Sequence, residues 1–267
     1  MKIDIAGVNV DNVTVKETLD IIDGYVRTDR PHYIVTTYSE FIVEAAKNSK
    51  FKEVLNKADL SVPDGIGILW AAKFLSMPKR DPVITTINWL GSLSSILLAP
   101  QSLRSVIKEQ VTGSRLIWDI ARLAQDNNYS LALYGGEQNA AEKTKEKLLQ
   151  KYPNLRINLA VSDKPFDQEA VQSIRASNSD ILLIAYQPPK QEIWIADNLQ
   201  SLNVKAAIGL GGTFDYISGK RKISPDWISY IGLEWLWRLV TQPWRWKRMW
   251  NAIIVFSCKV LSFKLKQ

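Results

Sequence analysis

The amino-acid sequence predicts an α/β protein: a Rossmann-like parallel sheet with helices on both faces, followed by a C-terminal helical appendage. Short aliphatic and β-branched runs alternate with stretches of helical apolar spacing, which is typical of parallel strands joined by helices. Basic residues and tryptophans then gather near the C-terminus. We therefore divide the chain into an α/β core over residues 1–218, with an extended insertion at 77–110, and a basic, tryptophan-rich appendage over 219–267.

The composition indicates a folded chain in a reducing compartment. Hydrophobic residues make up 46% of the sequence, enough for a sizeable core. The single cysteine, Cys258, excludes an intramolecular disulfide, and the single histidine, His32, argues against a histidine metal site or a Ser-His-Asp triad. A net charge of +7 suggests an anionic partner. The first residues lack the features of a signal peptide, so we expect a cytoplasmic protein.

The first part of the chain alternates between strand and helix patterns. The expected strands are Ile3–Val10, Tyr33–Thr37 and Asp59–Val62, and the expected helices are Thr14–Val26, Phe41–Ala46 and Ile66–Phe74. This order favours a parallel sheet with helices packed on it.

The insertion contains the uncharged stretch Val83–Ala99. Its Thr, Asn, Ser and Gly content makes it less hydrophobic than a typical transmembrane span. Trp89, Leu93, Ile96 and Leu97 share one helical face, which favours an amphipathic or interfacial helix. A helical hairpin packed on the core explains the pattern equally well.

The second part of the chain returns to alternation. The expected strands are Leu131–Tyr134, Leu155–Val161, Ile181–Tyr186 and Ala206–Leu210, and the expected helices are Thr112–Asn127, Ala140–Lys151, Gln168–Ser177 and Gln191–Leu199. We find no internal repeat and no low-complexity segment.

Five loops follow predicted strands and could form one crevice, because a doubly wound sheet gathers such loops along one edge. They are Thr36–Glu40, Pro63–Gly67, Gly135–Glu137, Gln187–Glu192 and Gly211–Asp215. Gly-Gly turns before helices let backbone N–H groups approach a phosphate. Neither a GxGxxG motif after the first strand nor a GxxxxGK[ST] motif is present, which argues against dinucleotide binding and a P-loop.

The second of these loops places Asp64 at the carboxyl end of a strand. Pro63 cannot donate to a sheet ladder and Gly65 permits unusual backbone conformations, so both suit a sharp exit from the strand. Asp64 by itself could serve only as a helix cap.

The appendage combines cations with aromatic residues. Six of the ten tryptophans lie here, and two helical stripes are expected, one over Trp227–Leu239 and one over Trp246–Cys258, separated at Pro243. Such a composition is typical of a membrane-surface helix. A single-stranded nucleic-acid surface, or a helix pair packed on its own domain with a solvated basic face, would have a similar composition.

Several motifs occur together in one order along nearly the whole chain. They are ADLSVPDGIG at 58–67, VTGS at 111–114, YGG at 134–136, PPKQEIWIADN at 188–198, GLGGTFDYISGKRKISPDW at 209–227 and GLEWLWRL at 232–239. In this combination the chain resembles the WecG/TagA/CpsF family of glycosyltransferases, with a longer insertion at 77–110 than the family usually has.

The resemblance implies an inverting transferase that needs no metal and no cofactor. Its donor would be a UDP-N-acetylhexosamine, typically UDP-N-acetylmannosamine. Its acceptor would be a polyprenyl-diphosphate-linked sugar used for cell-surface polysaccharide or teichoic-acid-type polymers. The expected location is the cytoplasmic face of the plasma membrane, with the appendage on its anionic surface. The Asp of PDG is the family's proposed base, here Asp64, which would deprotonate the acceptor hydroxyl.

The resemblance carries the family's donor contacts onto Thr36 and Gln191. With them we expect five neighbouring loop residues to bind the donor: Tyr38, Gly135, Gly136, Gln187 and Glu192. The expected acceptor-diphosphate residues are Arg238, Arg245 and Arg248, since guanidinium groups match diphosphate oxygens in shape and charge.

Four positions depart from the family pattern. The family usually has Asn where Tyr38 stands, Arg where Gln110 stands, an acidic residue where Arg115 stands and Gly where Gln187 stands. We expect an altered donor preference; a weakened enzyme and a non-catalytic membrane-associated scaffold are the alternatives. A nucleic-acid partner is not expected, because no recognisable nucleic-acid motif is present. The oligomeric state stays open, a homo-oligomer included.

Overall fold

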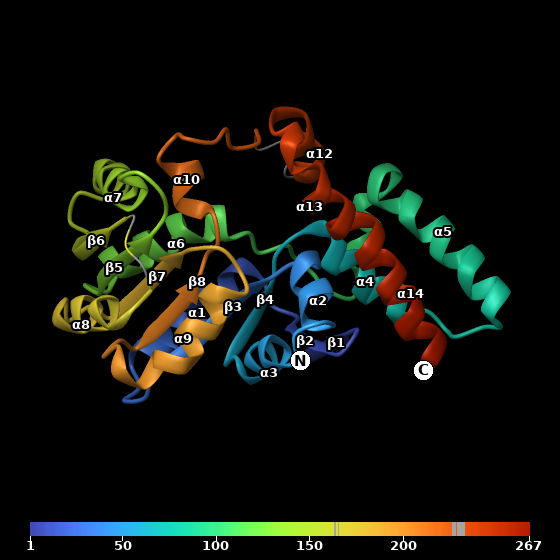
Figure 1. Cartoon of the computed structure of the whole chain (residues 1–267), viewed down its shortest axis with the longest axis horizontal. Helices are drawn as coiled ribbons and strands as arrows, with labels where there is room; N and C mark the ends of the chain where they lie inside the picture. Colours follow the sequence, from blue (N-terminus) through green and yellow to red (C-terminus); the bar gives the residue numbers. More distant parts are fainter. Residues whose placement is uncertain (163, 165, 226–227, 229–232) are drawn as a thin grey trace.

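The computed structural model contains one parallel sheet of six strands in the order β4-β3-β8-β7-β5-β6 (Figure 1). The structure describes residues 1–162, 164, 166–225, 228 and 233–267. The strands are β3 (His32–Thr37), β4 (Leu60–Pro63), β5 (Ser130–Gly135), β6 (Arg156–Val161), β7 (Ile181–Ala185) and β8 (Ala206–Gly209). The predicted α/β class and its parallel sheet are confirmed.

Helices cover both faces of this sheet, and the strand residues alternate between the two resulting cores. Tyr33 and Val35 belong to one buried cluster, whereas Ile34 belongs to the other. Helices α3 (Ser49–Lys57), α8 (Gln168–Ala176) and α9 (Lys190–Asn198) contribute to the first cluster. Helices α1 (Val15–Val26), α6 (Gly113–Asp126), α7 (Ala140–Lys151) and α10 (Thr213–Ile217) contribute to the second.

The chain segments that follow the neighbouring strands β3 and β8 continue on opposite faces of the sheet. The chain after β3 leads to α2 (Ser39–Ala45) and α3 on one side, and the chain after β8 leads to α10 on the other. In open α/β sheets a crevice forms at such a switch point, outside the carboxyl ends of the strands. The topology therefore predicts the position of a ligand site.

The N-terminal region differs from the prediction. Instead of one strand over Ile3–Val10, β1 (Lys2–Ile5) and β2 (Val8–Asp11) form a separate antiparallel hairpin. Its two-residue turn, Ala6-Gly7, has φ of +53° and +90°. Turns with positive φ at both positions match the twist of hairpin strands, but such a turn usually carries Asn or Asp where Ala6 stands, so the sequence signal is weak.

Two short helices were not predicted. Helix α3 begins after Asn48, whose side chain accepts a hydrogen bond from the backbone N–H of Phe51 at 3.0 Å. Helix α10 occupies part of the stretch expected to be the loop Gly211–Asp215. Both are short and lie close to a neighbouring element, so their periodicity covers too few turns to stand out.

The insertion forms α5 (Pro82–Leu98), followed by the 3-10 helix η1 (Pro100–Ser105). Helix α5 is fixed to α4 (Ile66–Ser76) by a hydrogen bond from the Trp70 indole to Ser92 Oγ at 3.0 Å. The Trp89 indole donates to the carbonyl of Ser257 at 3.1 Å. One face thus packs on the core while the other is exposed, so the structure combines features of both interpretations of this segment.

The C-terminal part lies beside α4 and α5 (Figure 1). It comprises α12 (Glu234–Thr241), η3 (Pro243–Arg245), α13 (Trp246–Trp250), the π-helix η4 (Asn251–Val255) and α14 (Phe256–Lys266). Phe256 and Val260 are buried in the first core cluster. The first part of the predicted helix over Trp227–Leu239 lies outside the described residues, which leave out 226–227 and 229–232. Its last part corresponds to α12. The boundary between 218 and 219 stays a prediction.

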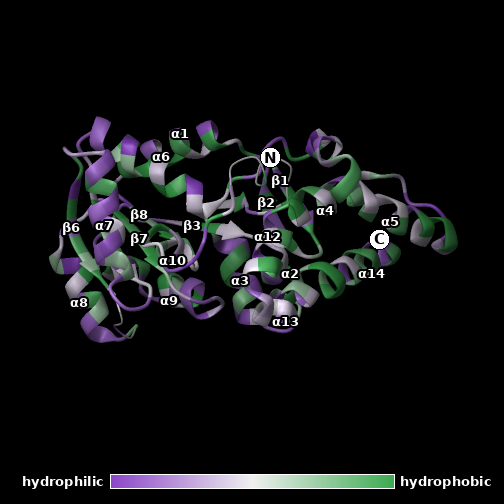
Figure 2. Cartoon of the chain, turned by 90° about the horizontal axis from the view of Figure 1, so that it is seen from above, coloured by the Kyte–Doolittle hydropathy of each residue, from purple (hydrophilic) through white to green (hydrophobic). Residues whose placement is uncertain are grey.

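Lys264 fastens α14 to the end of α4. Its buried ammonium donates to the carbonyls of Phe74, Leu75 and Met77 at 2.8, 3.0 and 2.6 Å. A cation at the C-terminus of a helix also complements the helix dipole. In Figure 2, α4, α5 and α14 are largely white to green, whereas α7 is largely purple. Among the described helices, none combines the length and hydropathy needed to cross a bilayer.

Candidate active site

A cavity of about 620 Å³ opens at the carboxyl ends of the strands, as the topology predicts. All five loops expected to form a crevice contribute side chains or backbone to it. Representative residues are Thr36, Asp64, Gly136, Gln187 and Gly212, one from each loop. The prediction that these loops meet is confirmed.

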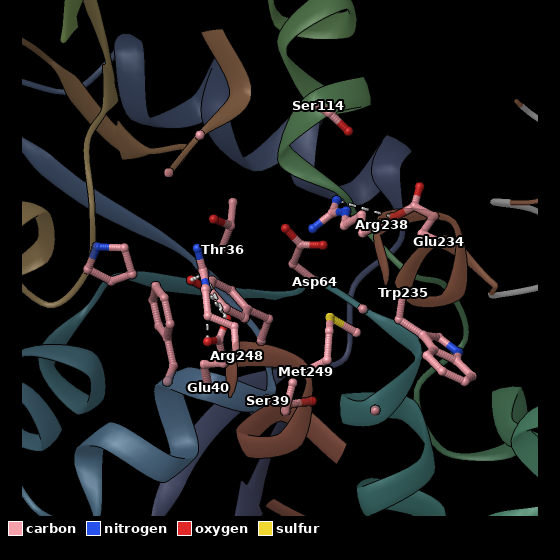
Figure 3. A pocket seen from close by; sticks show the side chains of 18 of the residues that line it. Thr36, Ser39, Glu40, Asp64, Ser114, Glu234, Trp235, Arg238, Arg248 and Met249 are labelled. Carbon is pink, nitrogen blue, oxygen red and sulfur yellow. Dashed lines mark hydrogen bonds and ion pairs between the residues drawn. The ribbon is translucent and has the colours of Figure 1, made fainter. Parts of the chain in front are cut away.

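Asp64 lies at the centre of this cavity (Figure 3). Its backbone N–H donates to the carbonyl of Thr37 at 2.8 Å, which extends the pairing of β4 with β3 by one residue. Gly65 follows with φ of +107°, a conformation that glycine adopts without strain, and α4 begins directly after it. The turn therefore aims the Asp64 carboxyl group into the cavity instead of along the helix, where it would act as a cap.

The environment of Asp64 favours its neutral form. Burial raises the pKa of this carboxyl group to about 7, against the opposing effect of the Arg238 guanidinium, while the nearby Glu234 carboxylate raises it further. The backbone N–H of Gly113 lies 3.5 Å from Asp64 Oδ2. A carboxyl group with a pKa near neutrality can accept a proton at physiological pH and is a candidate general base.

Two of the three predicted arginines reach the cavity from the C-terminal helices. Arg238 lies 3.6 Å from Glu234 and over the Tyr216 ring, with its guanidinium turned toward Asp64 (Figure 3). Arg248 pairs with Glu40 through Nε at 3.0 Å and through a terminal nitrogen at 2.7 Å. The side chain of Arg245 lies outside the described part of the structure.

Thr36 and Tyr38 line the cavity at the end of β3. The Thr36 hydroxyl donates to the carbonyl of Gly209 at 2.9 Å, so it also ties β3 to β8. The Tyr38 hydroxyl lies 3.3 Å from a terminal nitrogen of Arg248, and its ring packs against Phe41. Burial raises the pKa of Tyr38, so this phenol stays protonated at neutral pH.

Gln191 and Glu192 lie behind the cavity wall. Gln191 Oε1 accepts from the backbone N–H groups of Tyr186 at 2.8 Å and Gly211 at 3.2 Å, which joins the loops that follow β7 and β8. Gln191 Nε2 donates to Glu192 Oε1 at 2.5 Å. Burial raises the pKa of Glu192 to about 7, and its Oε2 has no hydrogen-bond partner among the described residues.

The Gly135-Gly136 turn is also constrained by packing. Both residues have positive φ, of +103° and +81°. A Cβ on Gly135 would collide with the carbonyl oxygen of Ala185, and the N–H of Gly136 donates to that same oxygen at 2.7 Å. The turn thus allows β5 and β7 to approach closely. The Gly136 N–H donates within the protein, to the Ala185 carbonyl.

The positions that depart from the family pattern are distributed unevenly. Tyr38, Gln110 and Gln187 line the cavity. Arg115 follows the lining residue Ser114 on α6 and is itself exposed. Three of the four departures therefore fall where they can affect a bound ligand.

Sequence reasoning assigned no role to several charged residues of the cavity. Arg221 lines it and pairs with Asp215 at 3.0 Å, and Glu40 and Glu234 hold the two arginines described above. Their signals were present, because Arg221 lies in the GKRK run and Glu40 ends the segment that begins at Thr36. Residues 1–162, 164, 166–225, 228 and 233–267 contain no group of three or more His, Cys, Asp or Glu side chains suited to a metal ion.

A switch-point cavity with a carboxyl group of raised pKa and converging arginines is typical of an enzyme active site, and the match to known sequences gives the class as glycosyltransferase. Residues 3–95 and 92–267 match the glycosyl transferase WecG/TagA/CpsF family, and the chain belongs to that family.

Curated relatives cover most of the chain. A Bacillus subtilis (strain 168) protein is 28% identical over 241 residues, which is 89% of this chain and 83% of its own length. A Bacillus spizizenii protein is 27% identical over 84% of this chain and 77% of its own length. A Staphylococcus aureus (strain MRSA252) protein is 25% identical over 99% and 94%. All three are named N-acetylglucosaminyldiphosphoundecaprenol N-acetyl-beta-D-mannosaminyltransferase.

Proposed function

We propose that this glycosyltransferase moves an N-acetylhexosamine, N-acetylmannosamine first, from a UDP-sugar to a polyprenyl-diphosphate-linked N-acetylglucosamine. The product would enter cell-surface polysaccharide or teichoic-acid-type synthesis. The relatives' names support the transferred sugar and the acceptor. The observation that carries the proposal is the Asp64 carboxyl group, with a pKa near 7, beside Arg238 in one cavity.

In the proposed mechanism the ionised Asp64 accepts the proton of the acceptor hydroxyl. The hydroxyl oxygen attacks the anomeric carbon from the side opposite the leaving group, and the bond to the UDP oxygen breaks with its electron pair. The configuration at that carbon is inverted. General-base catalysis of this kind contributes about 10²- to 10⁴-fold.

Arginines would supply the positive charge that binding of the acceptor diphosphate requires, and the family resemblance implies a mechanism without a metal. The guanidinium group binds phosphate oxygens through two parallel N–H donors and stays protonated at all relevant pH values. Arg238 is assigned to the acceptor diphosphate because it lies closest to the base. Arg248 and Arg245 are assigned to the same partner, and Arg248 must share its donors with Glu40.

The donor is proposed to bind along the ends of β3, β5, β7 and β8. Thr36, Tyr38, Gly136 and Gln187 face the cavity there. Gln191 acts from behind as a positioning residue, through the amides of Tyr186 and Gly211 that it holds. Glu192 and Gly135 would support the same wall from within.

We further propose that the protein docks on the anionic cytoplasmic face of the plasma membrane. Trp244, Trp246 and Trp250 expose 73%, 56% and 56% of their surface, which is unusual for so large an apolar side chain. Lys247 lies between Trp246 and Trp250 on α13. Indole rings at headgroup level and cations near lipid phosphate would act together, each cation adding about 1 kcal/mol near an anionic surface.

A screen of UDP-sugars against a lipid-linked N-acetylglucosaminyl diphosphate tests the reaction. We expect transfer from UDP-N-acetylmannosamine or a close analogue, with inversion seen by NMR of the product, and loss of transfer in Asp64→Asn. Absence of transfer from every UDP-sugar with a folded protein would favour the scaffold alternative. Vesicle flotation with and without anionic lipid tests the docking.

A further inference from the structure

The active-site cavity continues from its charged centre into an apolar arm. We define the arm by six lining residues from α4, α5, η4 and α14: Trp70, Leu93, Ile96, Leu97, Ile253 and Phe256. Helix α4 connects the two parts, since it begins beside Asp64 and carries Trp70 about 6 Å along its axis from Ile66. Figure 1 shows α4, α5 and α14 side by side at this end of the molecule.

The arm offers almost nothing for a sugar or a nucleotide to bind. Trp70 Nε1 is the sole polar side-chain atom among the six residues that define it, and it already donates to Ser92 Oγ. Ser257, at its edge, uses its hydroxyl on the carbonyl of Ile254 at 3.1 Å and its own carbonyl on Trp89. A polar ligand would lose its water here without replacement hydrogen bonds, which is costly, whereas an apolar chain would not.

The rim of the arm is apolar as well. Leu97 and Leu98, at the end of α5, expose 56% and 82% of their surface. An elongated ligand can therefore have a charged group at Arg238, an apolar segment in the arm and a remainder that leaves over an apolar edge. A diphosphate linked to a long hydrocarbon chain has this order of parts.

We propose that the apolar arm binds the first isoprenoid units of the lipid-linked acceptor. This inference rests on the proposed function, because it requires the acceptor diphosphate to lie at Arg238. Three of the six side chains, Leu93, Ile96 and Leu97, come from the insertion. The insertion thus forms one wall of the acceptor site, and α5 is held in place for this by the Trp70 and Trp89 indoles.

The test compares two acceptors with the same N-acetylglucosaminyl diphosphate head, one carrying a farnesyl chain and one a methyl group. The wild-type protein should have a kcat/KM at least about 10-fold higher for the farnesyl acceptor, since burying apolar groups of this size is worth that much. In Leu93→Ser/Leu97→Ser the farnesyl-to-methyl ratio of kcat/KM should fall about 10-fold.

A matched control uses Ile87→Ser/Leu90→Ser, on the same helix but exposed and away from the cavity lining. Its ratio should equal that of the wild type. An equal fall in both variants would show that α5 acts through its outer face, for example on micelles, and would overturn the inference. A wild-type ratio near one would overturn it too. Thermal unfolding verifies that both variants are folded.

A second measurement is independent of turnover. Farnesyl diphosphate with a diazirine near its apolar end should crosslink to peptides containing residues 93–97 or 252–257, and excess unlabelled farnesyl diphosphate should suppress the reaction. Crosslinking elsewhere overturns the inference. If the wild type transfers sugar to neither acceptor, the proposed function has failed, and crosslinking alone then decides whether the arm binds isoprenoid.

Discussion

The two walls of the active-site cavity are held in different ways. The strand-end wall is fixed by hydrogen bonds that each involve the backbone: the Asp64 N–H donates to the Thr37 carbonyl, the Thr36 hydroxyl donates to the Gly209 carbonyl, and Gln191 Oε1 accepts from two loop N–H groups. The helical wall, from α12 to α14, places its cations by ion pairs with carboxylates, Arg238 with Glu234 and Arg248 with Glu40.

This difference separates two tasks. Hydrogen bonds to the backbone of a sheet hold a reacting group in one geometry, which the proposed general base requires. An arginine that is paired with a carboxylate can exchange this partner for a substrate diphosphate. The guanidinium then has an anionic partner in both states, so the cost of an unpaired buried charge is avoided. The comparison therefore predicts that changes in the first wall lower kcat, and changes in the second weaken binding.

The largest expected effect is that of Asp64→Asn. The variant keeps the size of the side chain but cannot accept the proton, so kcat should fall about 100-fold or more. In the wild type, kcat/KM should rise with pH through about 7, because the basic form of Asp64 is populated above its raised pKa. Near-normal turnover in a folded variant, or a flat profile between pH 5 and 8, would contradict the assignment.

The same substitution should stabilise the fold at alkaline pH. The pKa of Asp64 is raised in the folded state, so that state binds a proton more tightly than the unfolded chain between about pH 4 and 7, and stability is lost as the pH rises through this window. Asn removes this loss. At pH 8 the Tm of Asp64→Asn should exceed that of the wild type by several degrees, and at pH 4 the difference should be much smaller. A lower Tm at pH 8 would show that the carboxylate is better solvated than the cavity indicates.

A smaller effect is expected from the second wall. Arg238→Gln should raise KM for the lipid-linked acceptor about 10- to 100-fold, because a charge-assisted bidentate contact is lost. Arg248→Gln leaves Glu40 without its cation, so the informative experiment is a double-mutant cycle with Glu40→Gln. Arg238→Lys is the control for charge without the planar fork. Unchanged acceptor KM in Arg238→Gln would remove this residue from the acceptor site.

The first wall was largely predictable from the sequence. Strand runs such as Ile181–Tyr186 and turns such as Pro63-Asp64-Gly65 are local signals, and the rule that ligands bind at strand ends brings the loops together. Asp64 could therefore be placed in a crevice before its neighbours were known. The raised pKa could not be predicted, because it depends on burial and on Glu234, far along the chain.

For the helical wall, the sequence predicted only the types of residue present, not their contacts. The arginines were expected to meet an anion, but Arg248 pairs with a residue 208 positions away, and no local pattern contains that information. The Lys264 contacts with the end of α4 and the apolar arm formed by α5 are of the same long-range kind. The hairpin of β1 and β2 was missed for the opposite reason, since its turn residue Ala6 is locally atypical.

A further reduction of kcat/KM, of about 10-fold, is expected when Gln191, which lies behind the strand-end wall, is replaced. Gln191→Leu leaves the backbone N–H groups of Tyr186 and Gly211 without their acceptor, so the loops after β7 and β8 should separate. We expect about a 10-fold lower kcat/KM, since small misplacements of binding groups reduce rates strongly. Gln191→Glu retains the acceptor oxygen but loses the Nε2 donor to Glu192, so it should restore only part of the activity. Full activity in Gln191→Leu would show that the sheet alone positions these loops.

The smallest expected effect concerns the choice of donor. Tyr38 and Gln187 line the cavity at two positions where the family resemblance leads us to expect Asn and Gly, and the Tyr38 hydroxyl also contacts Arg248. In Tyr38→Asn/Gln187→Gly the ring is replaced by an amide and the cavity gains the space of the Gln187 side chain, so the expected stacking on the donor is exchanged for a hydrogen bond. The ratios of kcat/KM between UDP-sugars should change by about 3- to 10-fold, a typical size for changes in pocket contacts that leave the chemistry intact.

Tyr38→Phe is the matched control, because Tyr38 belongs to the strand-end wall but touches an arginine of the helical wall. This variant keeps the ring and removes only the contact with Arg248. A shift in Tyr38→Phe as large as in the double variant would mean that donor choice is set through Arg248, and an unchanged ranking in both would mean that neither position determines the sugar.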